Sequence, residues 1–215
     1  MKGIGWLLLV LGVTAACGGG SNGGDGETVL EFLGFDQDMT LNYEVDVGLA
    51  LPQAGQVKVA GVDPGYVDGV DAYRVEMRQN GNLIATRWYQ VDDAGLFLLG
   101  EQVVEGSGVV ERRYLTPVKL LPYPFTNDAG VAVQNWSTTS DVEQGGSETH
   151  RFDNQGQGNV TVPAGDFSAY HLVHQRTVGV DGPTTALEEY FSPGHWYVKF
   201  EYSPESTWSL APAGG

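Results

Sequence analysis

The segment from Ala72 to Val91 places the strongest constraint on the fold. Apolar and polar residues alternate on both sides of Asn80-Gly81, a dipeptide typical of two-residue hairpin loops because both positions of a type I′ turn need a positive φ. Such a loop sets the register of the two strands. It pairs Gln79 with Asn82, Met77 with Ile84, Val75 with Thr86, and Tyr73 with Trp88. The last three pairs are expected to face the core, and Arg74, Arg78 and Arg87 to face solvent.

Similar short runs, separated by turn residues, recur along the chain, and no window has a helical period. The clearest are Phe167 to Val178, Thr185 to Phe191 and His195 to Tyr202. In the last run the alternation predicts Trp196, Val198, Phe200 and Tyr202 inside, and His195, Tyr197, Lys199 and Glu201 outside.

Weaker candidates bring the number of short strands to about ten. They are Leu96–Val104, Val109–Leu115, Leu120–Phe125, Asn135–Thr139, Glu148–Phe152 and Val160–Val162. The sequence therefore predicts an all-β, mainly antiparallel domain that forms a curled sheet, a half-open barrel or a sandwich.

The first sixteen residues are organised like a signal peptide. Lys2 gives a positive start, Ile4 to Val13 is apolar, and Thr14-Ala15-Ala16 supplies the small residues that a signal peptidase requires. Thr14-Ala15-Ala16-Cys17 resembles the lipobox of bacterial lipoproteins, in which the cysteine is acylated and becomes the first residue. The resemblance implies that Cys17 is the lipidation site and anchors the chain to a membrane of the cell envelope. Gly18 after the cysteine implies the outer membrane.

The chain is expected to divide into four parts. Residues 1–16 form the signal peptide, 17–27 the acylated Cys17 with a glycine-rich tether, 28–206 a single β domain, and 207–215 a C-terminal tail. Cys17 is the only cysteine, so no internal disulfide forms. The formal net charge of −16 repels phosphate backbones, and we expect no nucleic-acid partner.

Three segments of the β domain are similar to a family of uncharacterised exported bacterial proteins, which themselves resemble the half barrels of the periplasmic lipoprotein carriers. The first is Leu121-Pro-Tyr-Pro-Phe125 with Gly130 and Trp136 after it; the others are Val160 to Phe167 and Tyr190 to Lys199. The resemblance implies a sheet curled around a helix or a hydrophobic cavity. It assigns no catalytic residue.

The four histidines are expected to be surface or hydrogen-bonded residues. His171 and His174 have the HxxH spacing, but residues three apart on a strand point to opposite faces and cannot share one ion. His195 lies on the polar face of its strand, and His150 lies in a Ser/Thr/Glu-rich stretch.

The carboxylates indicate no defined site. Asp36-Gln37-Asp38 begins like an EF-hand loop, but Leu41 stands where glycine is needed. Asp63, Asp68 and Asp71 surround Pro64-Gly65 in a predicted loop, where they either hold calcium or only favour turns. Asp92-Asp93 and Glu188-Glu189 are adjacent pairs, whose side chains diverge on a strand.

The sequence thus predicts an envelope lipoprotein that is not an enzyme and needs no cofactor or metal. The 5 Trp, 10 Tyr and 8 Phe residues are numerous, and form either a filled core or an aromatic-lined cleft. With the second resemblance, they favour non-catalytic binding of a hydrophobic or lipid-like ligand. The alternative is a structural lipoprotein with a filled core that binds another envelope protein.

Overall fold

The computed structural model describes residues 28–106, 108–127 and 129–213. The segment that holds the predicted signal peptide, Cys17 and the tether lies outside them. The described residues form twelve strands and one short helix, which confirms the all-β, antiparallel prediction. The strands are β1 (Thr40–Asp46), β2 (Gln53–Val67), β3 (Val70–Gln79), β4 (Asn82–Asp92), β5 (Gly95–Glu105), β6 (Gly108–Pro122), β7 (Asn135–Asp141), β8 (Ser147–Val162), β9 (Gly165–Val178), β10 (Thr184–Ser192), β11 (Trp196–Ser203) and β12 (Ser206–Leu210).

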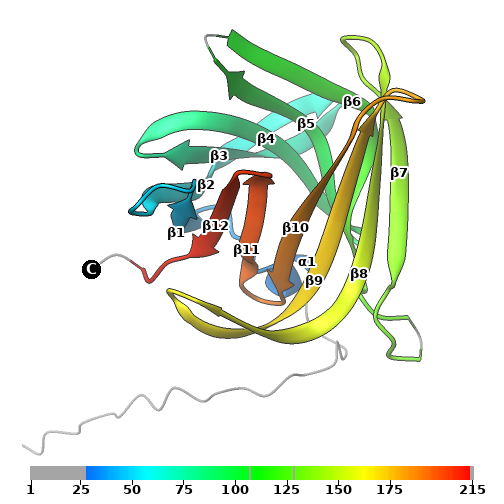
Figure 1. The fold of residues 1–215 in the computed structure, drawn as a ribbon. Helices are drawn as coiled ribbons and strands as arrows, with labels where there is room; N and C mark the ends of the chain where they lie inside the picture. The colour runs from blue at the N-terminus through cyan, green and yellow to red at the C-terminus, as the bar shows by residue number, and fades with distance from the viewer. Residues whose placement is uncertain (1–27, 107, 128, 214–215) are drawn as a thin grey trace, which may run out of the picture.

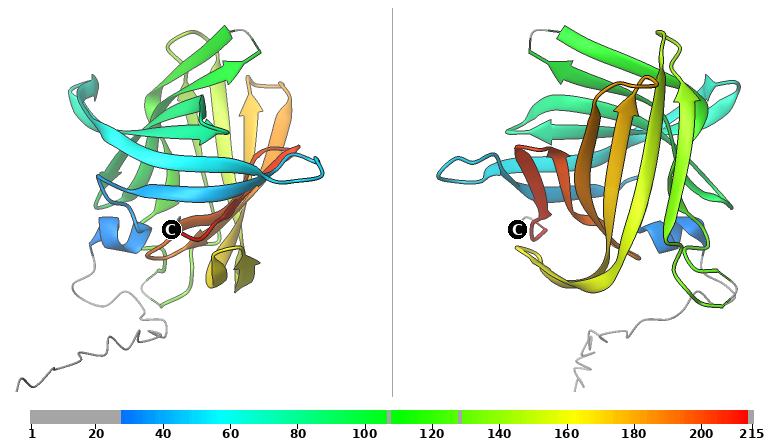
Figure 2. Two further views of the ribbon diagram at one scale, coloured as in Figure 1. Left: turned by 90° about the vertical axis from the view of Figure 1, so that its left-hand side faces the viewer. Right: turned by 45° about the vertical axis from the view of Figure 1, so that its right-hand side comes forward.

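All twelve strands form one sheet that curls into a nearly closed barrel (Figure 1). Its order is β6-β5-β4-β3-β2-β1-β12-β11-β10-β9-β8-β7. Strands that are consecutive in the chain are therefore neighbours in the sheet, with two exceptions. The first strand pairs with the last, as in Val45 opposite Trp208. The second place is the seam where the two edges, β6 and β7, come together (Figure 2).

Side chains, rather than a continuous backbone ladder, close this seam. Tyr114 and Val142 form a single isolated bridge. Nearby, the backbone N–H of Thr116 donates to Ser140 Oγ at 2.9 Å, and that of Lys119 donates to Thr138 Oγ1 at 3.2 Å. The edge strand β6 therefore satisfies part of its backbone hydrogen bonding with side chains of β7, without being paired along its length.

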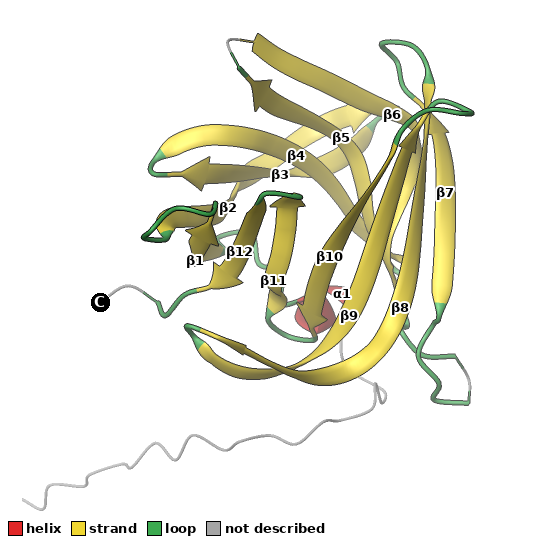
Figure 3. Ribbon diagram, viewed as in Figure 1, coloured by secondary structure: helices red, strands yellow, loops and turns green. Residues whose placement is uncertain are grey.

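One end of the barrel is plugged by the helix α1 (Val29–Leu33), shown in red in Figure 3. Thr28 and Glu31 form a capping box at its start, and Gly34 ends it with a φ of 63°. The ring of Phe32 packs on Phe125 and Phe191 with centroids 6.2 and 5.4 Å away. The sequence predicts no helix here, because five residues are too few to show a 3.6-residue period.

The two ends of the barrel differ because consecutive strands of a meander turn at alternate ends. α1 precedes β1, and the turns β2–β3, β4–β5, β6–β7, β8–β9 and β10–β11 lie at the same end as α1. The other six turns, including Asn80-Gly81 and those that follow β5 and β11, surround the opposite end. We call the first the closed end and the second the open end.

The Asn80-Gly81 turn forms as predicted, with φ of 49° and 78°, and Gln79 pairs with Asn82. Beyond it the predicted register is wrong. A bulge between Met77 and Arg78 shifts the pairing, so that Met77 lies opposite Ala85, Val75 opposite Arg87 and Tyr73 opposite Tyr89. Arg87 therefore points into the barrel.

Trp88 consequently lies on the outer surface, and its predicted inward position is wrong. It is covered there by Tyr66, whose ring stacks on it at 4.8 Å, and its indole N–H donates to Asp63 Oδ2 at 2.7 Å. With Ala72 and Leu99 it forms a small buried cluster separate from the main core.

In the C-terminal part the predicted strands are all present, but two details are wrong. A bulge pairs Tyr197 with Phe191 and buries it, although the alternation places it outside. Residues 207–210 belong to β12 rather than to a tail, and Trp208 is fully buried against Tyr43 and Phe200. Trp196 and Phe200 do lie in the core, as predicted.

The predicted loop around Asp63 is also wrong, because Asp63 lies within strand β2. β2 continues through Pro64 and Gly65 to Val67, and only Asp68 and Gly69 form the turn into β3. Asp68 has a φ of 50° there, which Asp tolerates better than most residues.

Candidate functional site

The barrel encloses a cavity of about 400 Å³. It is lined by residues from β2–β6 and β8–β11, and residues next to open-end turns, such as Glu105 and Pro204, form its mouth. Much of the wall is apolar: Val57, Val75, Met77, Leu98, Val103, Leu120, Leu187, Trp196 and Phe200. The interior is therefore not completely filled, in contrast to the alternative interpretation of the aromatic content.

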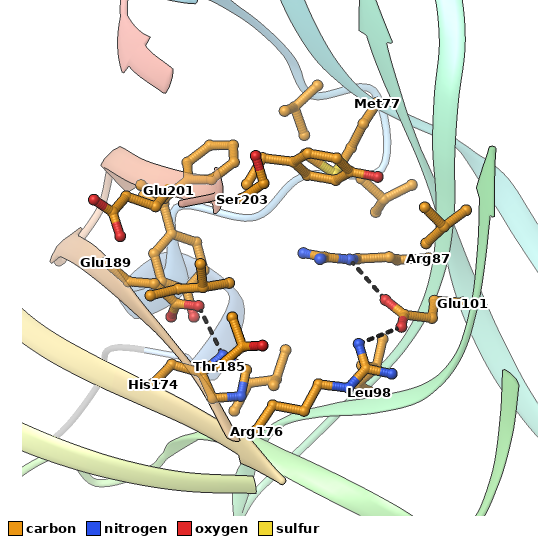
Figure 4. Close-up of a pocket in the computed structure, with 18 of the residues that line it drawn as sticks. Met77, Arg87, Leu98, Glu101, His174, Arg176, Thr185, Glu189, Glu201 and Ser203 are labelled. Atoms are coloured by element: carbon orange, nitrogen blue, oxygen red, sulfur yellow. Dashed lines mark hydrogen bonds and ion pairs between the residues drawn. The ribbon is translucent and has the colours of Figure 1, made fainter. Parts of the chain in front are cut away.

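A cluster of charged side chains lines the other part of the wall (Figure 4). Its centre is Glu101, which has only 2% of its surface exposed. Arg87, Glu101 and Arg112 are paired in register across β4, β5 and β6, which places them side by side on the inner face. Glu101 lies 3.5 Å from Arg87 Nε, 3.4 Å from Arg112 Nη1 and 2.8 Å from Arg176 Nη1.

A second buried carboxylate, Glu148, joins the cluster from β8. Arg176 donates to both of its oxygens, from Nε at 2.8 Å and from Nη2 at 2.9 Å. The Tyr114 hydroxyl donates to it at 3.0 Å, and Arg112 Nε lies 3.3 Å away. Because Arg112 and Tyr114 belong to β6, these bonds cross the seam and hold its two sides together on the inside.

The arginines keep both carboxylates ionised. Burial acts to raise the pKa of Glu101, but the nearby guanidinium groups of Arg87, Arg176 and Arg112 together bring it below its usual value. Burial likewise opposes ionisation of Glu148, whereas the imidazole of His150, with Nε2 3.4 Å away, and the hydrogen bonds from Arg176 lower its pKa to about 2. A carboxylate with so low a pKa is a poor general acid at neutral pH.

Two histidines continue the polar wall toward β10. His150 Nδ1 and His174 Nε2 are 3.0 Å apart, and His174 Nδ1 lies 3.1 Å from Glu189 Oε1. A hydrogen bond between two imidazole nitrogens needs one N–H and one lone pair, so both rings cannot be doubly protonated. Burial lowers the pKa of His150, with Arg176 and His174 acting in the same direction and Glu148 against it.

This histidine predicts how stability depends on pH. Between its lowered pKa in the folded state and its ordinary value near 6.5, the unfolded chain binds a proton that the folded chain does not. The free energy of unfolding therefore falls as the pH is lowered through this window, by at most about 1.4 kcal/mol per pH unit from His150. Glu148 adds nothing there, because its contribution is lost only below its unfolded pKa near 4.5.

We expect His150→Gln to reduce this slope, as measured by urea unfolding at about pH 7.5 and about pH 5.5. His195→Gln is the matched control, because His195 is exposed at the turn before β11. An unchanged slope in His150→Gln would contradict the assignment.

The structure separates most of the residues that the sequence singled out. His171 stacks on Tyr190 at 4.6 Å and is not part of the cavity wall, whereas His174 is, so the two do diverge as predicted. Asp63 binds Arg74 and Trp88, and Asp71 accepts from the Gly65 N–H. Among residues 28–213 as described, no three His, Cys, Asp or Glu side chains are grouped to hold a metal ion.

Sequence reasoning missed the charged cluster. A usable signal existed in β9, where Leu172, His174 and Arg176 alternate on one face and Leu172 is fully buried. The alternation placed Arg87 on the outer face, because the bulge between β3 and β4 cannot be seen in the sequence. Glu148 and Arg112 come together only because the sheet curls.

Comparison with known proteins identifies no family: no family model matches the chain, and no curated protein matches it. A crystal structure of a presumed lipoprotein from Parabacteroides distasonis is similar at 13% identity and a TM-score of 0.44. The match covers 84% of this chain and 98% of that one. No helix in the described part of the chain is long and apolar enough to cross a membrane.

Proposed function

We propose that this chain is a lipoprotein of the cell envelope whose barrel binds a hydrophobic or lipid-like molecule without chemical conversion. The cavity is the observation that carries the proposal. Its volume of about 400 Å³ lies within the range typical of small-molecule sites, and apolar walls with a few polar groups are their usual composition. The lipobox-like segment at Cys17 supports an anchor in the envelope, and the outer membrane is the proposed location.

The polar groups of the cavity fit a binding role better than a catalytic one. Glu101 and Glu148 are each held by arginines. A carboxyl group that acts as a general acid usually has a raised pKa, so that it still carries its proton near neutral pH. The closed end, with its packed phenylalanines, leaves the open end as the route for a ligand.

Binding can be tested with N-phenyl-1-naphthylamine, a neutral dye that fluoresces in apolar surroundings. We expect the fluorescence to rise to saturation as the dye binds. Val103→Trp should lower the affinity for the dye at least tenfold, because the larger ring occupies the cavity. Leu115→Trp is the control, since Leu115 is 56% exposed and does not line the cavity. Equal dye binding by both variants, each shown to be folded by circular dichroism, would place the dye elsewhere and contradict the proposal.

A further inference from the structure

The three arginines of the cavity are not equally engaged. Arg176 is the most fully engaged, because each of its three guanidinium nitrogens donates to a carboxylate oxygen within 2.9 Å. Each nitrogen of Arg112 also has a carboxylate nearby, those of Glu148, Glu101 and Glu105, at 3.3 to 3.9 Å. The nearest carboxylate to Arg87 is 3.5 Å away, from Nε, and that nitrogen makes no hydrogen bond within the described chain. The other groups that interact with its guanidinium are the phenols of Tyr89 and Tyr202.

Arg87 also differs from the other two in direction. Figure 4 shows its side chain extending from β4 toward the middle of the cavity, with the terminal nitrogens farthest from Glu101. The side chain has 28% of its surface exposed although it lies on the inner face of the barrel, so this surface faces the cavity. The hydroxyl of Tyr202, another lining residue, is buried and has no hydrogen-bond partner in the part of the chain that the structure describes.

The two buried carboxylates of this wall are bound mainly by the other two arginines. Glu101 and Glu148 both lie closest to Arg176 and both also contact Arg112, whereas Arg87 reaches only Glu101, at 3.5 Å. Glu105 at the mouth is 58% exposed and lies 3.9 Å from Arg112, so it contributes little to this pairing. Glu189 also lines the cavity; one of its oxygens lies 3.1 Å from His174 Nδ1, and the other has no hydrogen-bond partner among the described residues. An enclosed cation with an incomplete set of partners is stabilised by an anion that binds it.

The apolar part of the cavity wall lies deeper than Arg87, where it could contact a hydrocarbon tail attached to the anion. Leu98, Leu120 and Trp196 line the cavity, and Trp196 packs on Phe35, next to α1 at the closed end. Arg87 lies near the middle of β4, between this floor and the mouth. A molecule that enters tail first therefore brings its head group to the level of Arg87.

We infer that Arg87 receives the anionic head group, a carboxylate or a phosphate, of a single-chain amphiphile whose hydrocarbon tail fills the deeper part of the cavity. The inference rests on the proposed binding function and adds the class of ligand. Arginine suits both anions, because its planar fork donates two parallel hydrogen bonds to either.

The test compares four molecules with the same twelve-carbon chain by displacement of N-phenyl-1-naphthylamine from the wild-type protein. They are dodecanoate, dodecyl phosphate, 1-dodecanol and dodecyltrimethylammonium. We expect at least one anion to bind about ten- to a hundredfold more tightly than the alcohol, the range for a hydrogen bond to a charged group. The tighter of the two anions identifies the head group.

Two variants test the residue. Arg87→Gln should abolish the preference for the anion over dodecanol, and Arg87→Lys should keep part of it. Arg74→Gln, which removes an arginine paired with Asp63 outside the cavity, should keep all of it. Far-UV circular dichroism shows whether each variant is folded. If Arg87→Gln does not fold, the affinities of Arg87→Lys and of the wild type for the four twelve-carbon compounds are compared instead.

The outcomes separate the two levels of the proposal. Equal binding of acid and alcohol by the wild type, or tighter binding of the ammonium compound, would overturn the head-group inference and leave the binding function intact. A preference that persists in Arg87→Gln would place the anion on another group and also overturn it. Failure of the dye and of all four chains to bind would overturn both.

Discussion

Glu101→Gln is expected to lower the free energy of unfolding by about 3 to 5 kcal/mol, the range for removing one partner of a buried ion pair. The substitution keeps the shape of the side chain and removes only its charge. Arg112 and Arg176 would then have Glu148 as their buried carboxylate and Arg87 would have none, so part of the buried positive charge would not be compensated. Denaturant unfolding followed by tryptophan fluorescence measures the change.

Glu76→Gln is the matched control for this substitution. Glu76 also pairs with an arginine, Arg78 at 2.8 Å, but both side chains are partly exposed and do not line the cavity. Such pairs contribute about 0 to 1 kcal/mol. Similar losses in the two variants would show that the interior cluster does not hold the barrel together.

Trp208→Ala is expected to cost about 3 to 5 kcal/mol, the range for truncating a buried aromatic side chain. Trp208 has no exposed surface, and its ring packs on Phe200 at 5.5 Å and on Tyr43 at 5.8 Å. It lies on β12, which pairs with β1 on one side and with β11 on the other.

Removing Ser206 onward should prevent folding, because β1 and β11 would both lose a partner.

A chain that ends after Ala211 is the control for this truncation, since it keeps all of β12. We expect it to unfold at the same denaturant concentration as the full chain. If the chain that ends at Glu205 were equally stable, the pairing of β1 with β12 would not contribute to the fold.

Much of the fold could be predicted from local signals. The Asn80-Gly81 turn, the alternation in β9–β11 and the turn residues between them each specify a strand within a few residues. Two bulges defeated the alternation, because an extra residue in a strand moves every later side chain to the other face. Arg87 and Tyr197 were assigned to solvent for this reason.

The cavity and its charged cluster depend on contacts that no local pattern contains. Arg112 and Arg176 are far apart in the sequence, and Glu101 and Glu148 hold them together only once the sheet has curled. Trp208 gave no strand signal, since β12 has only five residues and follows Pro204 closely. Its place is decided by pairing with β1 at the opposite end of the domain.

The most direct test of the binding function is native mass spectrometry of the Cys17→Ala variant, exported by the cell and purified without detergent. The proposed anchor predicts that this variant is free of the membrane. We expect a reproducible extra mass that organic solvent extracts and that Val103→Trp removes, and fragmentation of the extracted molecule would identify its head group. A bare polypeptide mass, unchanged after addition of lipids, would contradict the account and show that the cavity is only a packing feature of the barrel.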